Sequence, residues 1–168
     1  MAESDVDLVG RLQDIISTLS SEGSEGYGTE TIRKLKVAQA RPGQIVLEVT
    51  VTKDLLNHFG ALHGAAIALV SIGAFVFNVR YCLHDWSKMV DFCPTLALVS
   101  AGKAAGVSVD LSTQYLSSAR EGDVVLVSAD VVKTGGTLAF TKTVIRDKDS
   151  GKIIASGTHL KFIKASKL

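Results

Sequence analysis

Residues 57 to 68 read Asn57-His58-Phe59-Gly60-Ala61-Leu62-His63-Gly64-Ala65-Ala66-Ile67-Ala68, a polar loop that runs directly into an apolar helical stretch. A helix that begins at His63-Gly64 presents unpaired backbone N–H groups and the positive end of its dipole. Such a helix end polarises a carbonyl group or holds an anion. Because Gly64 has no side chain, a substrate can approach its backbone closely. We therefore place the chemistry of the protein at this junction.

The composition indicates one domain with a sizeable core, because the chain has 168 residues of which 46% are hydrophobic. Its 18 basic and 17 acidic residues leave a net charge of +1, which argues against a nucleic-acid surface. The apolar run from Gly64 to Phe77 is interrupted by Ser71 and is shorter than the ~20 residues that span a bilayer. We expect a buried helix and no membrane span.

The two cysteines and the last three residues bear on the compartment. Cys82 and Cys93 lack metal-ligand spacing and no secretory signal is present, which favours a reducing compartment, free thiols and no metal site. The chain ends Ser166-Lys167-Leu168, and a free terminal Ser-Lys-Leu is a peroxisomal address read by an import receptor. We expect peroxisomal import, with the cytoplasm as the alternative.

The amino-terminal half shows one helical pattern and two strand patterns. Apolar residues recur at three- and four-residue spacing over residues 4–19, which predicts an amphipathic helix with Ser4 as its N-cap. Residues 20–28 are rich in Ser, Gly and Glu and are typical of a linker, so we divide the chain into 1–28 and a domain over 29–168. Strands are expected at 31–40 and 44–52, on either side of Arg41-Pro42-Gly43.

After the central helical region, strand patterns occupy residues 106–116, 123–133, 137–146 and 152–163. In the first of them Val107, Val109, Leu111, Thr113 and Tyr115 alternate with Ser108, Asp110, Ser112 and Gln114. Gly135-Gly136 and Asp149-Ser150-Gly151 are typical of hairpin turns. This order predicts an α+β fold in which an antiparallel sheet is wrapped around one long central helix.

Four stretches of this layout match a known family. They are Asn57-x-x-Gly60-x-Leu62-His63-Gly64, Gly106-Val107-Ser108-Val109-Asp110-Leu111, and the pair Lys133-Thr134-Gly135-Gly136-Thr137-Leu138-Ala139-Phe140 and Gly151-Lys152-Ile153-Ile154-Ala155-Ser156-Gly157. With them, the chain from about residue 34 to 161 resembles the PaaI-like hotdog acyl-CoA thioesterases, and the eukaryotic acyl-CoA thioesterases of that group look most similar. The resemblance implies a hotdog fold and hydrolysis of fatty or aromatic acyl-CoA thioesters.

The resemblance also implies roles for individual residues. The thioester carbonyl is expected against the Gly64 N–H and the Asn57 side chain, which stabilise the developing oxyanion. A carboxylate from the neighbouring protomer activates water or attacks directly, Ser108 positions that water, and His63 has a positioning role. The residues Tyr115, Arg120, Lys133, Gly135, Gly136 and Thr137 are expected to contact coenzyme A, which is part of the substrate, so no separate cofactor is implied. Such proteins form homodimers or homotetramers.

The chain departs from the family pattern at the carboxylate. The family carries an acidic residue about nine positions after the histidine, but Ile72 stands at that place here. The nearest match is Asp91, 28 positions after His63, so about nineteen extra residues fall at 69–87. For Asp91 to reach the thioester, this segment must loop out of the helix, and we hypothesise a genuine insertion, a splice variant or a gene-model artefact.

Each site residue also has a plainer interpretation. Asn57 is equally typical of a turn, and Asp91 of a helix N-cap ahead of Pro94. Arg120 is equally plausible as a solvated charge. The main alternative at the level of function is a hotdog protein that binds acyl-CoA without hydrolysing it, because the insertion displaces the carboxylate.

Overall fold

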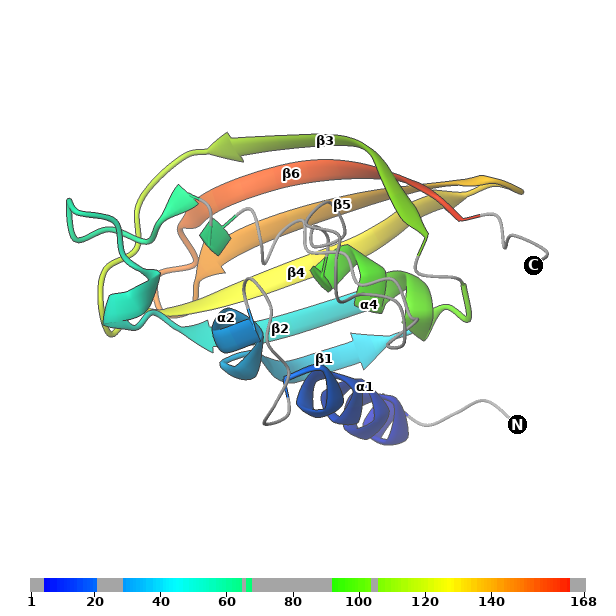
Figure 1. The fold of residues 1–168 in the computed structure, drawn as a ribbon, viewed down its shortest axis with the longest axis horizontal. Coiled ribbons are helices and arrows are strands. Elements are labelled where there is room, and N and C mark those ends of the chain that lie inside the picture. The colour runs from blue at the N-terminus through cyan, green and yellow to red at the C-terminus, as the bar shows by residue number, and fades with distance from the viewer. Residues whose placement is uncertain (1–4, 21–28, 65, 68–91, 104–105, 164–168) are drawn as a thin grey trace.

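The computed structural model describes residues 5–20, 29–64, 66–67, 92–103 and 106–163, and these carry the elements of Figure 1. The helices are α1 (Asp5–Leu19), α2 (Thr29–Arg33) and α4 (Phe92–Ser100), with a 3-10 helix η1 (Lys53–Leu55). The strands are β1 (Lys36–Arg41), β2 (Gln44–Thr50), β3 (Val107–Tyr115), β4 (Val124–Thr134), β5 (Leu138–Asp147) and β6 (Ile153–Phe162).

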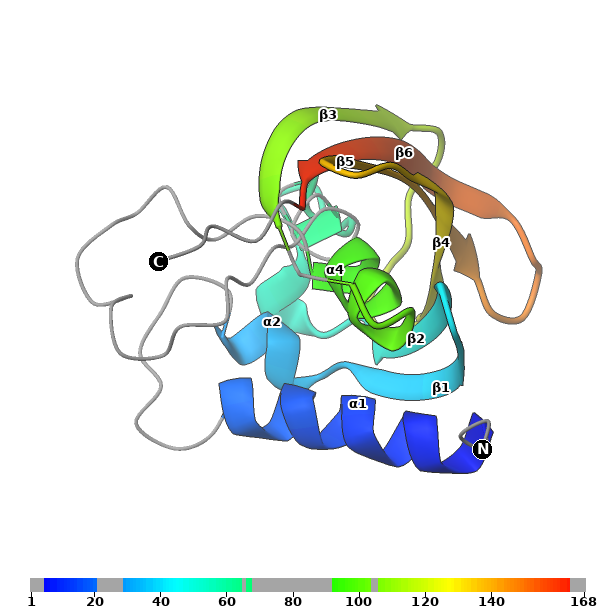
Figure 2. The ribbon, with the colours of Figure 1, turned by 90° about the vertical axis from the view of Figure 1, so that its right-hand side faces the viewer.

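The strands form one antiparallel sheet in the order β1-β2-β4-β5-β6-β3. The strand β3 is therefore placed at an edge, beside the last strand of the chain. The sheet curls around α4, which packs mainly against β4 and β2 (Figure 2). The inward residues of α4 and the sheet form one apolar core, as the predicted hotdog arrangement requires.

The last four strands confirm the sequence pattern, because each begins and ends within one residue of its expected position. Their turns also have the expected chemistry. The Gly135 N–H donates to the Leu138 carbonyl at 2.7 Å in the β4–β5 hairpin. In the β5–β6 hairpin Gly151 adopts φ +69°, a conformation that favours glycine.

The strand predicted over residues 31–40 is wrong at its start. The backbone N–H groups of Lys34 and Leu35 donate to the carbonyls of Thr31 and Ile32, at 3.2 and 3.1 Å, and the chain turns as α2 before β1 begins at Lys36. Thr31 and Ile32 are β-branched, which favours a strand locally, but both side chains are buried in the turn. Burial of this short helix therefore overrides the local preference.

The regular alternation predicted for β3 is wrong at its first residues. Ser108 is opposite Lys161 on β6, whereas Asp110 is opposite Leu160, so Val109 is an extra residue in a β-bulge. One extra residue reverses the side of the sheet on which the residues before it lie. Ser108 is thereby placed on the same face as Tyr115, which is the inner face.

The helix α1 covers the edge strand β1. Its apolar residues Leu8, Leu12 and Ile16 are buried in the core. Its Gln13 side chain behaves as a strand partner, because Oε1 accepts from the Val37 N–H at 2.8 Å and Nε2 donates to the Leu35 carbonyl at 3.5 Å. Two backbone groups at the start of this sheet edge are thus satisfied within the chain.

Several predictions fall outside the described residues. They concern the Ser4 N-cap, the linker, the extra segment 69–87, Asp91, and the terminal Ser166-Lys167-Leu168. Among the helices that the structure describes, none is long and apolar enough to cross a membrane.

Candidate functional site

The loop after η1 closes on itself like a small hairpin. The His63 N–H donates to the Leu55 carbonyl and the Asn57 N–H donates to the Ala61 carbonyl, each at 2.8 Å. These two bonds hold the end of the loop, at Ala61 and His63, beside its beginning, at Leu55 and Asn57. The loop therefore brings Asn57 to the start of the helix that follows.

The side chain of Asn57 is oriented by the tip of this loop. Its Oδ1 accepts hydrogen bonds from the N–H groups of Phe59, at 2.9 Å, and Ala61, at 3.2 Å. An amide oxygen bound to two N–H donors fixes which end of the amide is which. Oδ1 therefore stabilises the turn, and the Nδ2 amino group is the end that can donate to another molecule.

Gly64 stands in the first turn of the helix, where the Ile67 N–H donates to the His63 carbonyl at 3.0 Å. Tyr115, at the end of β3, donates its hydroxyl to the Gly64 carbonyl at 3.3 Å. A Cβ atom added to Gly64 would lie 3.5 Å from the Tyr115 ring. Tyr115 therefore packs directly against this helix start, and the side chain of His63 beside it is exposed.

The loop is attached to the segment that follows β3. The Leu62 N–H donates to the Ala119 carbonyl at 2.8 Å. In the next residue, the Arg120 N–H donates to the Asp123 carboxylate at 2.8 Å, and the Arg120 side chain is exposed. Arg120 is thus presented to solvent from a turn that is fixed to the site loop.

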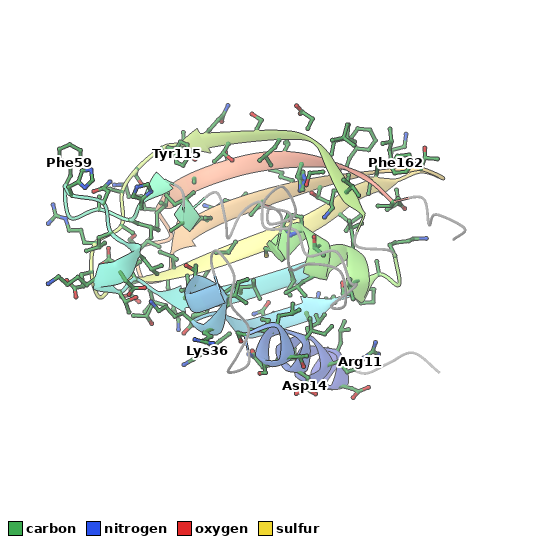
Figure 3. All side chains as sticks on the ribbon, viewed as in Figure 1. Arg11, Asp14, Lys36, Phe59, Tyr115 and Phe162 are labelled. Atoms are coloured by element: carbon green, nitrogen blue, oxygen red, sulfur yellow. The ribbon has the colours of Figure 1, made fainter. Side chains whose placement is uncertain are left out.

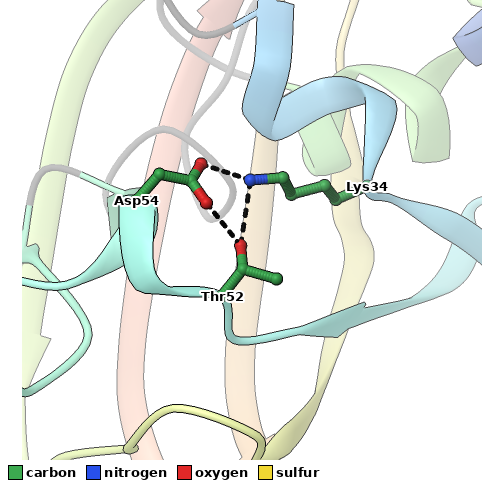
Figure 4. Close-up of polar contacts among 3 residues, drawn as sticks. All are labelled: Lys34, Thr52 and Asp54. Atoms are coloured by element: carbon green, nitrogen blue, oxygen red, sulfur yellow. Dashed lines mark hydrogen bonds and ion pairs between the residues drawn. The ribbon is translucent and has the colours of Figure 1, made fainter.

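A polar cluster of Lys34, Thr52 and Asp54 holds the entry to the loop (Figure 4). The Lys34 ammonium donates to the Thr52 hydroxyl at 2.9 Å and to the Asp54 carboxylate. The Thr52 hydroxyl donates to the other Asp54 oxygen at 2.7 Å. The Lys34 hydrogen bond, followed by that of Thr52, lowers the pKa of Asp54 below its ordinary value. This cluster fixes η1, from which the loop departs.

A small apolar cavity lies beneath the loop and the helix start. On the side of the loop and helix it is lined by Leu55, Leu62, Ala66 and Ile67. The opposite wall comes from α2 and the sheet, namely Thr31, Val49, Val125, Val127 and Ile145. A cavity with this lining suits an apolar group and not a charged one.

A second group of site residues lies at the other end of β3. Ser108 is paired with Lys161 of β6, and the fully buried Lys161 donates its ammonium to the Thr95 hydroxyl of α4 at 2.6 Å. Neither Lys161 nor Thr95 was among the site residues predicted from the sequence. One feature of the strand could have indicated Lys161. It follows His159 by two residues in β6, and residues two apart in a strand lie on the same face, which here is the buried one.

The β4–β5 hairpin carries the predicted phosphate-binding residues at the same end of the sheet. Lys133, Gly135, Gly136 and Thr137 are all exposed. The Ile163 N–H, just after β6, donates to the Thr137 carbonyl at 2.8 Å, which ties the hairpin to the neighbouring strand. The backbone N–H of Gly135 is used inside the turn, so that group does not remain for a ligand.

The structure therefore separates the predicted site residues into two groups. Asn57, His63, Gly64 and Tyr115 meet at one end of β3, whereas Ser108 lies seven residues away on that strand, or about 23 Å at ~3.3 Å per residue. Figure 3 shows Tyr115 and Phe162, the neighbour of Lys161, near opposite ends of the sheet. Within one chain these two groups do not form a single site.

The remaining candidates are a carboxylate and a thiol. Asp91 lies outside the described residues, directly before α4 in the sequence. Cys93 is fully buried, its thiol contacts the Val127 carbonyl at 3.6 Å, and burial raises its pKa well above the ordinary range. Cys93 is therefore not a nucleophile. Among the described residues, no three His, Cys, Asp or Glu side chains are grouped to hold a metal ion.

Comparison with known proteins assigns the family. The thioesterase superfamily model matches residues 59–154. Human acyl-coenzyme A thioesterase 13 is 34% identical over 131 residues, which cover 77% of this chain and 80% of the human protein.

Solved structures show the same fold. Zebra fish thioesterase superfamily member 2 has 29% identity and a TM-score of 0.76, over 92% of this chain and 97% of that chain. A mutant of the phenylacetic acid degradation protein PaaI from Thermus thermophilus has 22% identity and a TM-score of 0.60, over 77% of this chain and 92% of that chain. With its fold, its loop and this family match in agreement, the chain belongs to the thioesterase superfamily and has the hotdog fold.

Proposed function

We propose that this protein hydrolyses acyl-CoA thioesters, with water converting the thioester into a carboxylic acid and free coenzyme A. The observation that carries the proposal is the Asn57 amide, whose oxygen is occupied by the loop, so that its amino group is the end left to donate near the start of the Gly64 helix. Two donors at one point are what a developing oxyanion requires. The human relative is named an acyl-coenzyme A thioesterase, which supports the same substrate class.

In this proposal the thioester carbonyl oxygen accepts from the Gly64 N–H and from Asn57 Nδ2. Asp91 is the carboxylate that activates the water or attacks the carbonyl carbon, and Ser108 positions the water. His63 positions the loop through its backbone. If Asp91 activates water, collapse of the tetrahedral intermediate expels the thiolate of coenzyme A, which takes up the proton that Asp91 accepted from the water. If Asp91 attacks directly, expulsion of the thiolate leaves an anhydride on Asp91, and water then hydrolyses this anhydride to the carboxylic acid and the free Asp91 carboxylate.

The acyl group is proposed to extend toward the apolar cavity beneath Leu62 and Ile67. The cavity is small, at about 10 Å³, so an acyl group requires it to widen. Its lining suits fatty and aromatic acyl groups, since every residue that forms it except Thr31 is apolar. At the coenzyme A end, Tyr115 and Arg120 are proposed to line the pantetheine path. Lys133 with Gly136 and Thr137 is proposed to contact the phosphates, and Gly135 contributes only the shape of the turn.

We propose that the protein acts as a homodimer in which the β3 edges of two chains pair, and that two dimers form a homotetramer. The opposite edge, β1, is covered by α1, whereas β3 is exposed along almost its whole length. Large apolar side chains are exposed on β3 and the segment that follows it, namely Val107, Val109, Leu111, Tyr115 and Leu116. An uncovered edge with exposed apolar side chains favours pairing with another chain.

Antiparallel pairing of two β3 strands supports a shared site. A two-fold axis at the middle of β3 places the Tyr115 end of one chain beside the Ser108 end of the other. The two groups that are separated within a single chain then face each other. This is the arrangement that the catalytic proposal needs.

Import into peroxisomes through Ser166-Lys167-Leu168 remains a proposal, with the cytoplasm as the alternative. Its test is the location of the full chain fused at its amino terminus to a fluorescent protein. A version with Leu168 removed is the control, since a receptor that reads the free terminus no longer recognises it. Identical diffuse distribution of both fusions contradicts the proposal.

The test of the function is release of thiol from a panel of fatty and aromatic acyl-CoA esters. We expect hydrolysis by the full chain and a loss of at least about 100-fold in Asp91→Asn. The alternative of an acyl-CoA-binding protein without hydrolysis predicts an inactive full chain and activity only after deletion of residues 69–87. Equal activity of Asp91→Asn and the unmodified chain refutes the choice of Asp91.

A further inference from the structure

We propose that Tyr115 is a positioning residue for thioester hydrolysis, whose hydroxyl holds the backbone of Gly64 so that the Gly64 N–H keeps the direction that an oxyanion requires. The inference rests on the proposed function, because it assigns a further role at the same site. That role is separate from lining the pantetheine path, which needs only the ring of Tyr115. The observation behind it is the hydrogen bond from the Tyr115 hydroxyl to the Gly64 carbonyl.

A donor on a glycine needs a restraint from other residues. Glycine has more backbone freedom than any other residue, because no Cβ atom restricts its two dihedral angles. An N–H group stabilises an oxyanion well only when its direction is fixed before the charge develops. The unobstructed backbone of Gly64 is therefore accompanied by a loss of rigidity, which neighbouring groups must offset.

The main chain holds Gly64 on its amino-terminal side. The Gly64 N–H and the His63 carbonyl belong to one planar peptide group. The Ile67 N–H donates to that carbonyl at 3.0 Å, and the His63 N–H donates to the Leu55 carbonyl at 2.8 Å. These two bonds fix the peptide group that carries the proposed oxyanion donor.

Tyr115 holds the next peptide group, on the other side of the Gly64 Cα. Its hydroxyl donates to the Gly64 carbonyl at 3.3 Å. Its ring atoms Cε1 and Cζ would lie 3.5 and 3.6 Å from a Cβ atom added to Gly64, so the ring stands one methyl group away from the glycine backbone. The peptide groups before and after the Gly64 Cα are thus both held, and the dihedral angles between them are restrained.

The place of Tyr115 in the sheet suits this role. Tyr115 is the last residue of β3 and is paired with Ala155 of β6, a small residue beside which the larger ring can extend toward Gly64. A side chain on a paired strand is placed more precisely than one on a loop. Because Tyr115 lies 51 residues after Gly64 in the chain, the tertiary fold supplies this restraint.

The test compares Tyr115→Phe with Tyr115→Leu by release of thiol from acyl-CoA esters. Tyr115→Phe keeps the ring and loses only the hydroxyl. We expect its kcat to fall by about 3- to 10-fold, the factor for one hydrogen bond between neutral groups, and its KM to stay within about twofold. Tyr115→Leu also removes the ring, so we expect at least the same loss of kcat together with a higher KM.

Gly64→Ala supplies a second measurement. Its added Cβ restricts the backbone of residue 64 and meets the Tyr115 ring at an ordinary van der Waals distance, so we expect this variant to fold. If Tyr115 acts by restraining Gly64, Tyr115→Phe lowers kcat less in the Gly64→Ala background than in the unmodified chain. If Gly64→Ala is inactive, the kinetics of the single variant Tyr115→Phe decide.

Thr141→Val is the matched control. The Thr141 hydroxyl also donates to a backbone carbonyl, that of His159, at 3.1 Å. His159 lies four residues along β6 from Ala155, the partner of Tyr115, so this bond is distant from Gly64. We expect Thr141→Val to keep the kcat of the unmodified chain. A loss of kcat equal to that of Tyr115→Phe would show that the effect is not specific to the Gly64 contact, and would contradict the inference.

Three further outcomes overturn the inference. Unchanged kcat in a folded Tyr115→Phe shows that the hydroxyl has no part in hydrolysis, and a raised KM with unchanged kcat shows that it binds the substrate instead. An equal loss of kcat from Tyr115→Phe in both backgrounds shows that the hydroxyl acts independently of Gly64. An unmodified chain without thioesterase activity refutes the proposed function and this inference with it, whereas full activity of Tyr115→Phe in an active enzyme refutes this inference alone.

Discussion

The Asn57 side chain has two ends, and among the described residues only its oxygen takes part in folding. That oxygen accepts from the N–H groups of Phe59 and Ala61, so the amino group is the end that the turn leaves unused. The turn interpretation and the oxyanion interpretation of Asn57 are therefore compatible. One residue can serve both, because its acceptor and its donor are different atoms of the same amide.

Asn57→Asp separates these two roles. The new carboxylate has the same shape and still accepts from the two backbone N–H groups, but it cannot donate to an oxyanion and repels it. We expect the melting midpoint to change little and kcat to fall by about 100- to 1,000-fold, as for the loss of one oxyanion donor. Steady-state kinetics and thermal unfolding measure the two quantities.

Asn57→Ala is the comparison for this variant. It removes both the acceptor and the donor, so we expect the same loss of kcat together with a lower melting midpoint. An Asn57→Asp variant with the kcat of the unmodified chain would remove Asn57 from the oxyanion site.

Cys93 offers a prediction about reactivity at the scale of a single residue. Burial raises the pKa of its thiol, so the reactive thiolate is essentially absent at neutral pH. In a Cys82→Ser variant, we expect no modification by a thiol reagent at pH 8 until the protein unfolds. Rapid modification of the folded variant, followed by absorbance of the released reagent, would show that this part of α4 opens to solvent.

At the scale of elements, α1 and β1 form one unit through Gln13. The Gln13 amide satisfies the N–H of Val37 in the edge strand and the carbonyl of Leu35 just before it, much as a neighbouring strand would. We expect Gln13→Leu to lower the free energy of unfolding by about 1–2 kcal/mol, because it leaves the Val37 N–H without its acceptor. Urea unfolding measures this change, with Gln44→Leu as a surface control.

Light scattering gives a second measurement on the same variant. An uncovered β1 is a second open edge of the sheet, so concentration-dependent association is expected to increase in Gln13→Leu. Unchanged stability and association would show that α1 protects the edge through its apolar contacts alone.

The Lys34, Thr52 and Asp54 cluster predicts a pH dependence. The pKa of Asp54 is lowered in the folded protein from its ordinary value of 3.8, first by Lys34 and then by Thr52. The ionised carboxylate is therefore favoured by folding. Its contribution is fully present above that ordinary value and is lost as the pH falls through the lower, folded pKa.

The variant Asp54→Asn measures this contribution. We expect a loss below about 1 kcal/mol at pH 7, because exposed ion pairs are screened by solvent. The difference from the unmodified chain should shrink as the pH falls below 3.8 and the native carboxylate is protonated. Urea unfolding at several pH values tests it, and a difference that grows on acidification contradicts the assigned sign.

At the scale of the whole molecule, the two separated groups predict complementation between chains. Asn57→Asp damages one group and Ser108→Ala damages the other. If each site combines the two groups from different chains, a mixed dimer contains one intact site. After unfolding and joint refolding, half of the dimers are mixed, so we expect about a quarter of the original activity from two nearly inactive variants.

The control mixes two variants of the same group, Asn57→Asp with Asn57→Ala. Here every site in a mixed dimer retains one damaged residue, so no activity is expected to return. Recovery in this control, or none in the first mixture, contradicts a site shared across β3.

The sequence was sufficient to predict the last four strands, their hairpins and α1. These elements follow from local signals, namely alternating apolar residues, glycine turns and helical spacing, which do not depend on distant contacts. Local signals failed at Thr31 and Ile32, where burial selected a helical turn. They also failed to predict the face of the sheet on which Ser108 lies, because no pattern in the local sequence indicates that Val109 is an extra residue.

For the candidate site, the sequence alone predicted the loop and the residues that it contains, and their catalytic role stays a prediction. The tertiary structure decided the orientation of the Asn57 amide, the contact of Tyr115 with Gly64, and the burial of Lys161 against Thr95. It also decided that Ser108 lies at the far end of the sheet from Gly64. The physical reason is strand pairing, because residues that are distant in the chain become neighbours only through the order and register of the sheet.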